Sequence, residues 1–299
     1  MANMKSDIKH DIARALEHIG ETNRVRKTFW RMDEKVKDLK YGIQQGDDCV
    51  VVGKDVINME GPYPVKTGRK TGLIHTCSDV VVMGGRPLYA FNSMQVKDVK
   101  EAEDIAIDLK KQSDGLKVPL IGGNTQMERG LVSCVSFTVF GKLVRDPIPD
   151  GDCQKGDRIL LLGQILEGEI GERVYRANVK FETFLELVEK KVEIHAAKDA
   201  SRGGWFGNLA EMLVKSKKGA QVNSIPYPRL SRYMGSYLLS IPEDEVERIV
   251  KTAARRRCPV VEMGEVNEKL NIRLGSELVV GKKKMQDLMR KTPYRKTRG

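Results

Sequence analysis

The chain has 299 residues, of which 40% are hydrophobic and 31% charged, a composition typical of a soluble globular protein with about two domains. No apolar run approaches the roughly 20 residues of a membrane-spanning helix, and the five scattered cysteines form no CxxC pair, so a membrane protein, a disulfide framework and a zinc site are not expected. The net charge of +11 indicates a polyanionic partner only where basic residues cluster, and they do so near the C-terminus.

The N-terminal half is predicted to alternate helices and strands. Its first residues have no apolar signal core, which favours a cytoplasmic protein, and they carry an apolar stripe at helical spacing: Ile8, Ile12, Leu16 and Ile19. Strands are predicted over residues 49–53, 87–96, 117–123 and 131–144. Residues 98–112 are predicted as a helix, because apolar residues recur there at helical spacing: Ala102, Ile105 and Leu109.

A break is predicted at residues 144–157, VRDPIPDGDCQKGD, which are rich in Pro, Gly and Asp. We therefore expect an N-terminal domain over residues 1–147 and a C-terminal domain over residues 148–299. In the second domain, strands are predicted over residues 158–163, 237–242 and 259–266. A helix is predicted over residues 243–257, with acids at its start and three arginines at its end. The pattern predicts two α/β or α+β domains.

The stretch HTCSDVVVMGGRP, residues 75–87, places a single acid, Asp79, before an apolar run that ends at Gly84-Gly85 and Pro87. A buried carboxylate without a partner costs several kcal/mol, so it needs a hydrogen-bonded or cationic neighbour. Two interpretations stay open on these residues alone. Asp79 either lies near one end of a short helix, or it holds a cation.

Two further stretches combine acids, glycines and small polar residues. In GDDCVVV, Asp47 and Asp48 precede a strand, either as an ordinary turn or as oxygen ligands for Mg²⁺. In IGGNTQ, a glycine pair could let backbone amides approach a phosphate, although Gly-Gly-Asn is also common in turns. The residues concerned are Gly122, Gly123, Asn124 and Thr125.

The stretch AAKDASRGGWFGNLAEML, residues 196–213, places Asp199 and Arg202 before Gly203-Gly204 and an apolar helical face. Asp199 either caps that helix, or it binds a metal beside a helix start that faces a phosphate. No stretch matches GxxxxGK[ST], so the chain is not a P-loop protein.

In this order and spacing, the four stretches together resemble the aminoimidazole ribonucleotide (AIR) synthetase superfamily, called PurM-like. Its members include thiamine monophosphate kinase, selenide water dikinase and the hydrogenase-maturation protein HypE. GDDCVVV, HTCSDVVVMGGRP, GGNT and KDASRGG are similar to the family patterns GDDAAV, NxxDIAAMGGxP, GGDT and KDxSxGG. The resemblance extends over roughly residues 46–280 and is closest to AIR-synthase-related proteins of methanogenic archaea.

The resemblance implies a two-domain PurM-like fold, with an N-terminal mixed sheet that dimerises in a barrel-like manner and a C-terminal α/β sandwich. It implies a homodimeric, ATP- and Mg²⁺-dependent enzyme that phosphorylates or activates an oxygen of a small-molecule substrate. Asp47, Asp48 and Asp79 would hold Mg²⁺, while Asp199 and Arg202 would act in catalysis. The nucleotide would lie against Gly122, Gly123, Asn124, Thr125, Gly203 and Gly204.

The sequence also departs from the family pattern. Asn124 stands where members usually have Asp, and the segment between Asp48 and Asp55 is expected to be too short for the two strands commonly present there. The cysteines that selenide water dikinase and HypE use are absent, so neither activity is expected. A catalytically silent nucleotide-binding or assembly protein is therefore an alternative. His75 and His195, near the motifs, are expected to be structural.

The C-terminus gives a third alternative. Residues 281–299 contain eight basic residues against Asp287 alone, and such a tail can bind RNA by releasing counterions. A solvated basic terminus is the more common outcome, so nucleic acid is the less expected partner.

Overall fold

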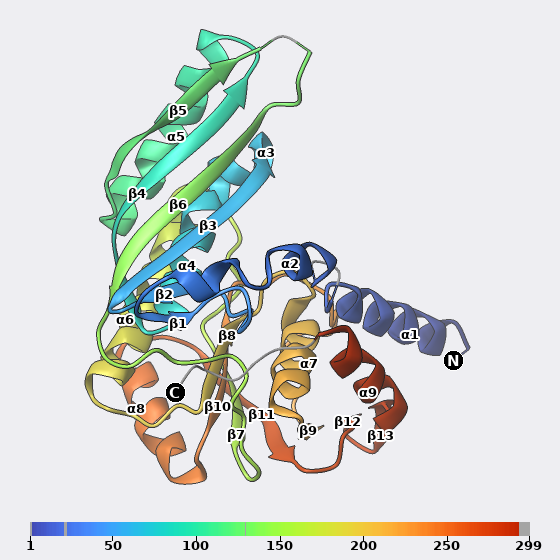
Figure 1. Ribbon diagram of the computed structural model, residues 1–299. Coiled ribbons are helices and arrows are strands. Elements are labelled where there is room, and N and C mark those ends of the chain that lie inside the picture. Colours follow the sequence, from blue (N-terminus) through green and yellow to red (C-terminus); the bar gives the residue numbers. More distant parts are fainter. Residues whose placement is uncertain (1, 21–22, 129, 293–299) are drawn as a thin grey trace.

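The computed structural model describes residues 2–20, 23–128 and 130–292, which form two mixed β-sheets covered by helices (Figure 1). The first sheet is built from residues 39–143 and the second from residues 158–280. The predicted two-domain α+β fold is therefore confirmed, and the predicted boundary after residue 147 lies in the segment between the sheets. No helix in the described ranges is both long and apolar enough to cross a membrane.

The N-terminal sheet has six strands in the order β1-β2-β3-β6-β4-β5. All neighbours are antiparallel except β4 and β5, which are parallel and are joined through a helix. The strands are β1 (Leu39–Tyr41), β2 (Val50–Val52), β3 (Asp55–Pro64), β4 (Gly85–Val96), β5 (Leu120–Met127) and β6 (Cys134–Leu143). The long strands β3 to β6 project as an arm away from the second domain (Figure 1).

One face of this sheet packs against helices. Buried residues alternate along β6, where Val135, Phe137 and Val139 belong to the main hydrophobic core. The helices of this half are α1 (Ala2–Glu17), α2 (Asn23–Phe29), α3 (Val65–Thr67), α4 (Leu73–Val82) and α5 (Val99–Leu116), with a π-helical turn η2 (Gly68–Gly72) before α4 and a 3₁₀ turn η1 (Met32–Lys35) before β1. Helix α5 begins after Asp98, whose side chain accepts a hydrogen bond from the Glu101 amide at 2.9 Å.

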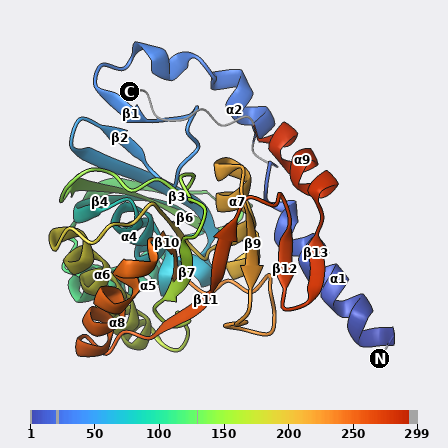
Figure 2. The same ribbon diagram turned by 90° about the horizontal axis from the view of Figure 1, so that it is seen from below.

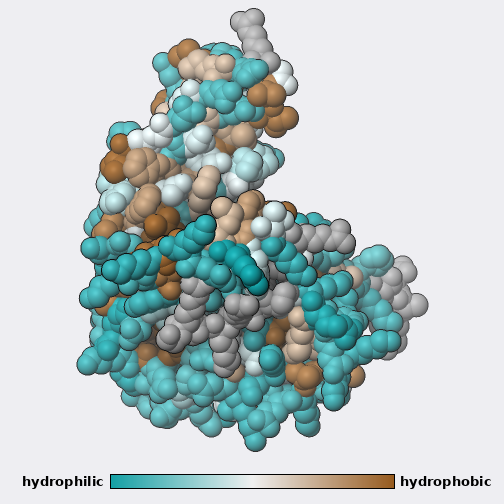
Figure 3. All heavy atoms as spheres, viewed as in Figure 1, coloured by the Kyte–Doolittle hydropathy of each residue, from teal (hydrophilic) through white to brown (hydrophobic). Residues whose placement is uncertain are grey.

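The opposite face of the arm carries uncovered apolar side chains. The Phe140 ring of β6 lies 5.4 Å from the Tyr89 ring and 5.8 Å from the Phe91 ring of β4. Met59 of β3 is 71% exposed beside them, and Figure 3 shows hydrophobic side chains gathered on the arm. Strand β5 adds an edge without a neighbour in the described part of the chain. Exposed edges and apolar faces of this kind favour association.

The C-terminal sheet has seven strands in the order β13-β12-β9-β11-β7-β10-β8, antiparallel except for β12 and β9. Helices α6 and α8 cover one face, and α7, α9 and α1 cover the other (Figure 2). The strands are β7 (Arg158–Leu162), β8 (Ala196–Asp199), β9 (Gly219–Val222), β10 (Tyr237–Ile241), β11 (Val260–Asn267), β12 (Ile272–Leu274) and β13 (Glu277–Val280). The helices are α6 (Ile170–Glu189), α7 (Gly204–Ser216), α8 (Val246–Arg255) and α9 (Lys282–Lys291), with a 3₁₀ turn η3 (Glu243–Glu245) before α8.

The predicted strands correspond to β2, β4, β5, β6, β7, β10 and β11, and the predicted helices to α5 and to η3 with α8. The segment between Asp48 and Asp55 holds one strand, β2, and β3 begins only at Asp55, which agrees with the expectation that two strands do not fit there. Strand β2 ends at Val52 and pairs with β3 from Asp55 onwards. This is possible because Gly53 adopts a φ of 59°, which allows a two-residue turn.

Candidate active site

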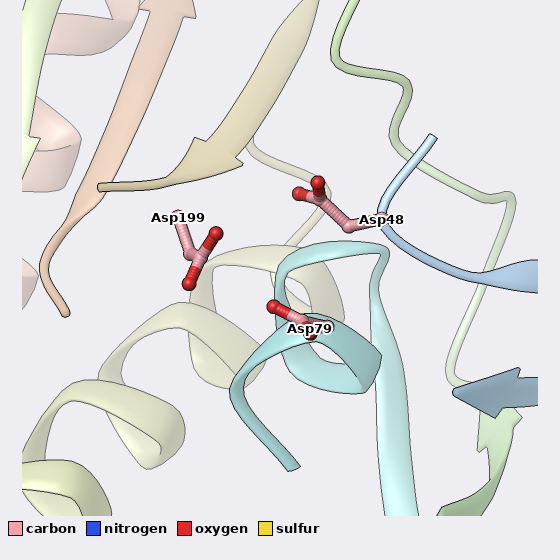
Figure 4. A group of neighbouring side chains, drawn as sticks. All are labelled: Asp48, Asp79 and Asp199. Atoms are coloured by element: carbon pink, nitrogen blue, oxygen red, sulfur yellow. The ribbon is translucent and has the colours of Figure 1, made fainter. Parts of the chain in front are cut away.

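Three carboxylates from three separate segments meet where the two domains touch (Figure 4). Asp48 lies in the loop before β2, Asp79 lies in the last turn of α4, and Asp199 ends β8. One carboxylate oxygen from each of the three residues lies within 4.8 Å of the chosen oxygens of the other two. Sequence positions 48, 79 and 199 are thus brought together by the packing of α4 against β8.

Asp79 is held in place by neighbours from both domains. Asn58 of β3 donates a side-chain hydrogen bond to Asp79 Oδ2 at 2.6 Å. The adjacent Ser78 accepts a hydrogen bond at its backbone carbonyl from the Tyr237 hydroxyl at 2.9 Å, and its Oγ accepts one from Lys180 Nζ at 3.0 Å. An acid near a helix C-terminus faces the negative end of the helix dipole, which is unfavourable without a nearby cation.

The electrostatics of this carboxylate group favour a bound cation. Burial, followed by repulsion from Asp199, raises the pKa of Asp79 well above its ordinary value. Burial and repulsion from Asp48 raise the pKa of Asp199 to about 7. Among the described residues, the buried oxygen Oδ2 of Asp48 has no hydrogen-bond partner. Several close carboxylate oxygens with an unsatisfied lone pair are the donor set that Mg²⁺ prefers, so the residues present fit this ion.

Lys198 connects the carboxylate group to a buried ion-pair network that the sequence did not predict. Its Nζ donates to Asp48 Oδ1 at 2.5 Å and to Asp150 Oδ2 at 2.9 Å. Asp150 also receives hydrogen bonds from Lys215 at 2.6 Å and 2.7 Å. The opposite charges beside it raise the pKa of Lys198 against the effect of burial. The only sequence signal for this role is the position of Lys198 next to Asp199 in the KDASRGG motif.

Asp47 is not a member of the three-carboxylate group, although the resemblance placed it with Asp48 and Asp79. It lines the same cavity, but its Oδ1 accepts a hydrogen bond from the backbone amide of Asp150 at 2.7 Å. Burial, followed by repulsion from Asp150, raises its pKa. Adjacent residues in an extended loop point in different directions, so Asp47 is turned toward the domain linker while Asp48 is turned toward the site.

The segment Gly122 to Thr125 does not reach the carboxylates within this chain. All four residues lie on β5, the exposed edge strand of the arm, and none lines the cavity beside the carboxylates. Close packing against β4 requires glycine at position 123, since a Cβ there would lie 1.8 Å from the Asn92 carbonyl oxygen. A nucleotide role for Gly122, Gly123, Asn124 and Thr125 stays a prediction.

The glycine pair before α7 is also required by packing. Gly203 and Gly204 have φ values of 92° and 68°, and a Cβ on Gly204 would lie 2.3 Å from the Leu230 carbonyl oxygen. Gly203 is the N-cap residue of α7, and no side chain caps this helix. The interpretation of Asp199 as a helix cap is therefore wrong, because Asp199 is the last residue of β8. Arg202 is exposed at the cavity mouth.

A cavity of about 630 Å³ surrounds the carboxylates, a volume that suits a small-molecule ligand. Its acidic lining also includes Glu60, which no sequence motif indicated and which accepts a hydrogen bond from Tyr63 at 2.7 Å. His75 lines it as a neutral residue, since burial lowers its pKa to about 3. His195 does not line this cavity and instead contacts Asp157 at 2.9 Å. Basic residues at the cavity are Arg26, Arg173, Lys198 and Arg202.

The two mixed sheets and the carboxylate group between them define a two-domain protein of the PurM-like class. Residues 37–143 match the AIR synthase related protein N-terminal domain, and residues 174–275 match the corresponding C-terminal domain. The uncharacterised protein MJ0799 of Methanocaldococcus jannaschii is 49% identical over 292 residues, covering 97% of this chain and 98% of that protein. The chain therefore belongs to the AIR synthase-related family.

More distant relatives share the fold, over part of their length for PurL and over most of it for HypE. The chain is 23% identical to phosphoribosylformylglycinamidine synthase subunit PurL of Carboxydothermus hydrogenoformans, covering 73% of this chain and 35% of PurL. The Thermotoga maritima PurL structure has a TM-score of 0.75 at 18% identity, covering 96% of this chain and 52% of that one. HypE in the HypE–HypF complex has a TM-score of 0.67 at 14% identity, covering 83% of this chain and 94% of HypE. The T. maritima PurL has been solved with ATP and with AMPPCP.

Proposed function

We propose that the protein is an ATP- and Mg²⁺-dependent enzyme that phosphorylates or activates an oxygen of a small-molecule substrate. The observation that carries this proposal is the group formed by Asp48, Asp79 and Asp199 in a cavity between two domains. Membership of the AIR synthase-related family and the ATP complexes of the structural neighbour PurL support it.

In this proposal, Asp48 and Asp79 hold Mg²⁺ from the first domain and Asp199 completes the site from the second. The ion supplies charge neutralisation where a phosphoryl group is transferred. Lys198 orients Asp48 through their direct hydrogen bond and lowers its pKa, although burial has the larger effect and raises that pKa overall. The location between domains lets small domain movements exclude water from the reacting groups. Arg202, at the cavity mouth, can contact an anionic substrate in bidentate fashion.

The deciding experiment is isothermal titration of AMPPCP with and without Mg²⁺, followed by ATP turnover in the presence of candidate small molecules. We expect nucleotide binding that depends on Mg²⁺ and turnover that depends on one substrate class. Binding without turnover in any extract fraction would favour the catalytically silent alternative. Absence of Mg²⁺-dependent binding would contradict the proposal.

We also propose a homodimer formed through the arm. The uncovered aromatic face of β4 and β6 and the open edge of β5 are surfaces that a second copy could cover. If Gly122 to Thr125 bind nucleotide, they must do so from a second copy, because they lie outside the cavity of their own chain.

A further inference from the structure

A second cavity of about 610 Å³ lies beside the acidic one. The two cavities share three lining residues, His18, Arg202 and Tyr233, so they are contiguous. Their charges differ sharply. The second cavity is lined by four arginines and a single carboxylate: Arg14, Arg202, Arg229, Arg232 and Glu17. We refer to it as the arginine cavity.

The arginine cavity is assembled from three segments that are fixed to one another. Arg14 comes from α1, Arg202 from the turn before α7, and the other two from the segment between β9 and β10. Asp11 of α1 accepts hydrogen bonds from the backbone amides of Leu230 and Ser231, at 2.5 Å and 3.2 Å. Because these contacts fix the backbone of Leu230 and Ser231, they also position the flanking residues Arg229 and Arg232. Asp11 is thus a positioning residue for this cavity.

Several hydrogen-bond donors in the cavity have no acceptor in the described part of the chain. Among the described residues, Arg14 and Arg229 have no ion-pair partner, and the buried Nε of Arg232 and the buried hydroxyl of Tyr233 have no hydrogen-bond partner. Arg232 is held in position by Glu167 at 2.8 Å and by the Tyr227 ring, 5.1 Å from its guanidinium carbon. Buried donors without partners cost stability, so a ligand that accepts hydrogen bonds would be favoured here.

We propose that the arginine cavity binds the anionic group, a phosphate or a carboxylate, of the substrate whose reactive oxygen enters the neighbouring acidic cavity. This inference rests on the proposed function. Guanidinium groups bind such anions through paired N–H donors, and four of them line this cavity, where Glu17 is the single carboxylate among the described lining residues. The acidic cavity is less suited to an anion without a metal, because its lining holds six carboxylates, Glu211 among them, against four basic side chains. The substrate class is therefore a small molecule that carries an anionic group apart from the oxygen that reacts.

The test is isothermal titration of inorganic phosphate, and separately of malonate, into the full chain, both alone and saturated with Mg²⁺ and AMPPCP. The variants are Arg14→Gln and Arg229→Gln, which remove the charged guanidinium group of exposed side chains that have no partner in the described ranges, and both should fold normally. The matched control is Arg145→Gln, an exposed arginine that lines neither cavity.

We expect at least one of the two anions to bind, and each variant to weaken its binding by about tenfold or more, while the control and the AMPPCP affinity stay unchanged. Which anion binds identifies the group that the cavity takes. Absence of binding by both anions, or equal binding by variants and control, would overturn the inference. Variants that weaken AMPPCP as strongly as phosphate would show that the cavity serves the nucleotide. Anion binding to the protein alone does not require bound nucleotide. This titration therefore tests the arginine cavity even if the protein does not bind Mg²⁺ and AMPPCP.

Discussion

Asp199→Asn should stabilise the protein when no divalent cation is present. Asp199 is 2% exposed and lies with Asp48 and Asp79 in one cluster. At pH 8 its carboxylate is ionised although burial and repulsion from Asp48 oppose the charge. Asparagine has nearly the same shape and no charge. The substitution therefore removes an unfavourable charge without opening a cavity.

The size of the effect follows from the pKa. Folding raises the pKa of Asp199 from 3.8 to about 7, and each pKa unit corresponds to about 1.4 kcal/mol, so the upper limit is about 4 kcal/mol. The sign follows from proton binding, since the native state holds the proton more tightly than the unfolded state. The loss of unfolding free energy caused by ionised Asp199 is absent below the pKa of the unfolded state. It grows as the pH rises from 3.8 to about 7 and is constant above that.

The assay is thermal unfolding in EDTA at pH 5 and pH 8, repeated with Mg²⁺. In EDTA at pH 8, the variant should unfold several degrees above the wild type, because about 1 kcal/mol shifts the Tm by roughly 2–4 °C in domains of this size. The advantage should shrink at pH 5. Added Mg²⁺ should raise the Tm of the wild type and leave the variant nearly unchanged.

The control is Asp55→Asn, which neutralises an exposed acid at the start of β3. Its Tm should equal that of the wild type in every condition. A lower Tm of Asp199→Asn than of the wild type at pH 8 in EDTA, or equal stabilisation of both proteins by Mg²⁺, would contradict this prediction.

Three further predictions test other parts of the molecule. Asp79→Asn should weaken Mg²⁺-dependent AMPPCP binding by about tenfold or more with an unchanged circular dichroism spectrum, and unchanged affinity would remove this residue from the site. Lys215→Met should cost about 3–5 kcal/mol in urea unfolding, because it leaves the buried Asp150 with one cationic partner fewer; an unshifted midpoint would contradict this. The wild type should be a dimer by light scattering at micromolar concentration, and Phe91→Lys should make it monomeric by placing a charge on the aromatic face of the arm. A monomeric wild type would refute the proposed interface.

The sequence by itself determined most of the local structure and the family. The runs of β7 and β10 predict strands because they are apolar apart from Arg158 and Ser240, and helix α5 follows from the helical spacing of its apolar residues. The order of the acid and glycine motifs identified the family, since such motifs are short and contiguous. Strand β3 was missed because its pattern is interrupted by Gly61 and Pro62.

Only the tertiary structure decided which motif residues meet. Asp48, Asp79 and Asp199 share a site because α4 packs against β8, whereas Asp47, one residue from Asp48, turns to Asp150 instead. The arginine cavity likewise depends on α1 lying against the segment before β10, which no local pattern encodes. Periodicity and propensity act between residues a few positions apart. The partner of a buried charge is set by segments that are distant in sequence, and it emerges only when the whole chain has packed.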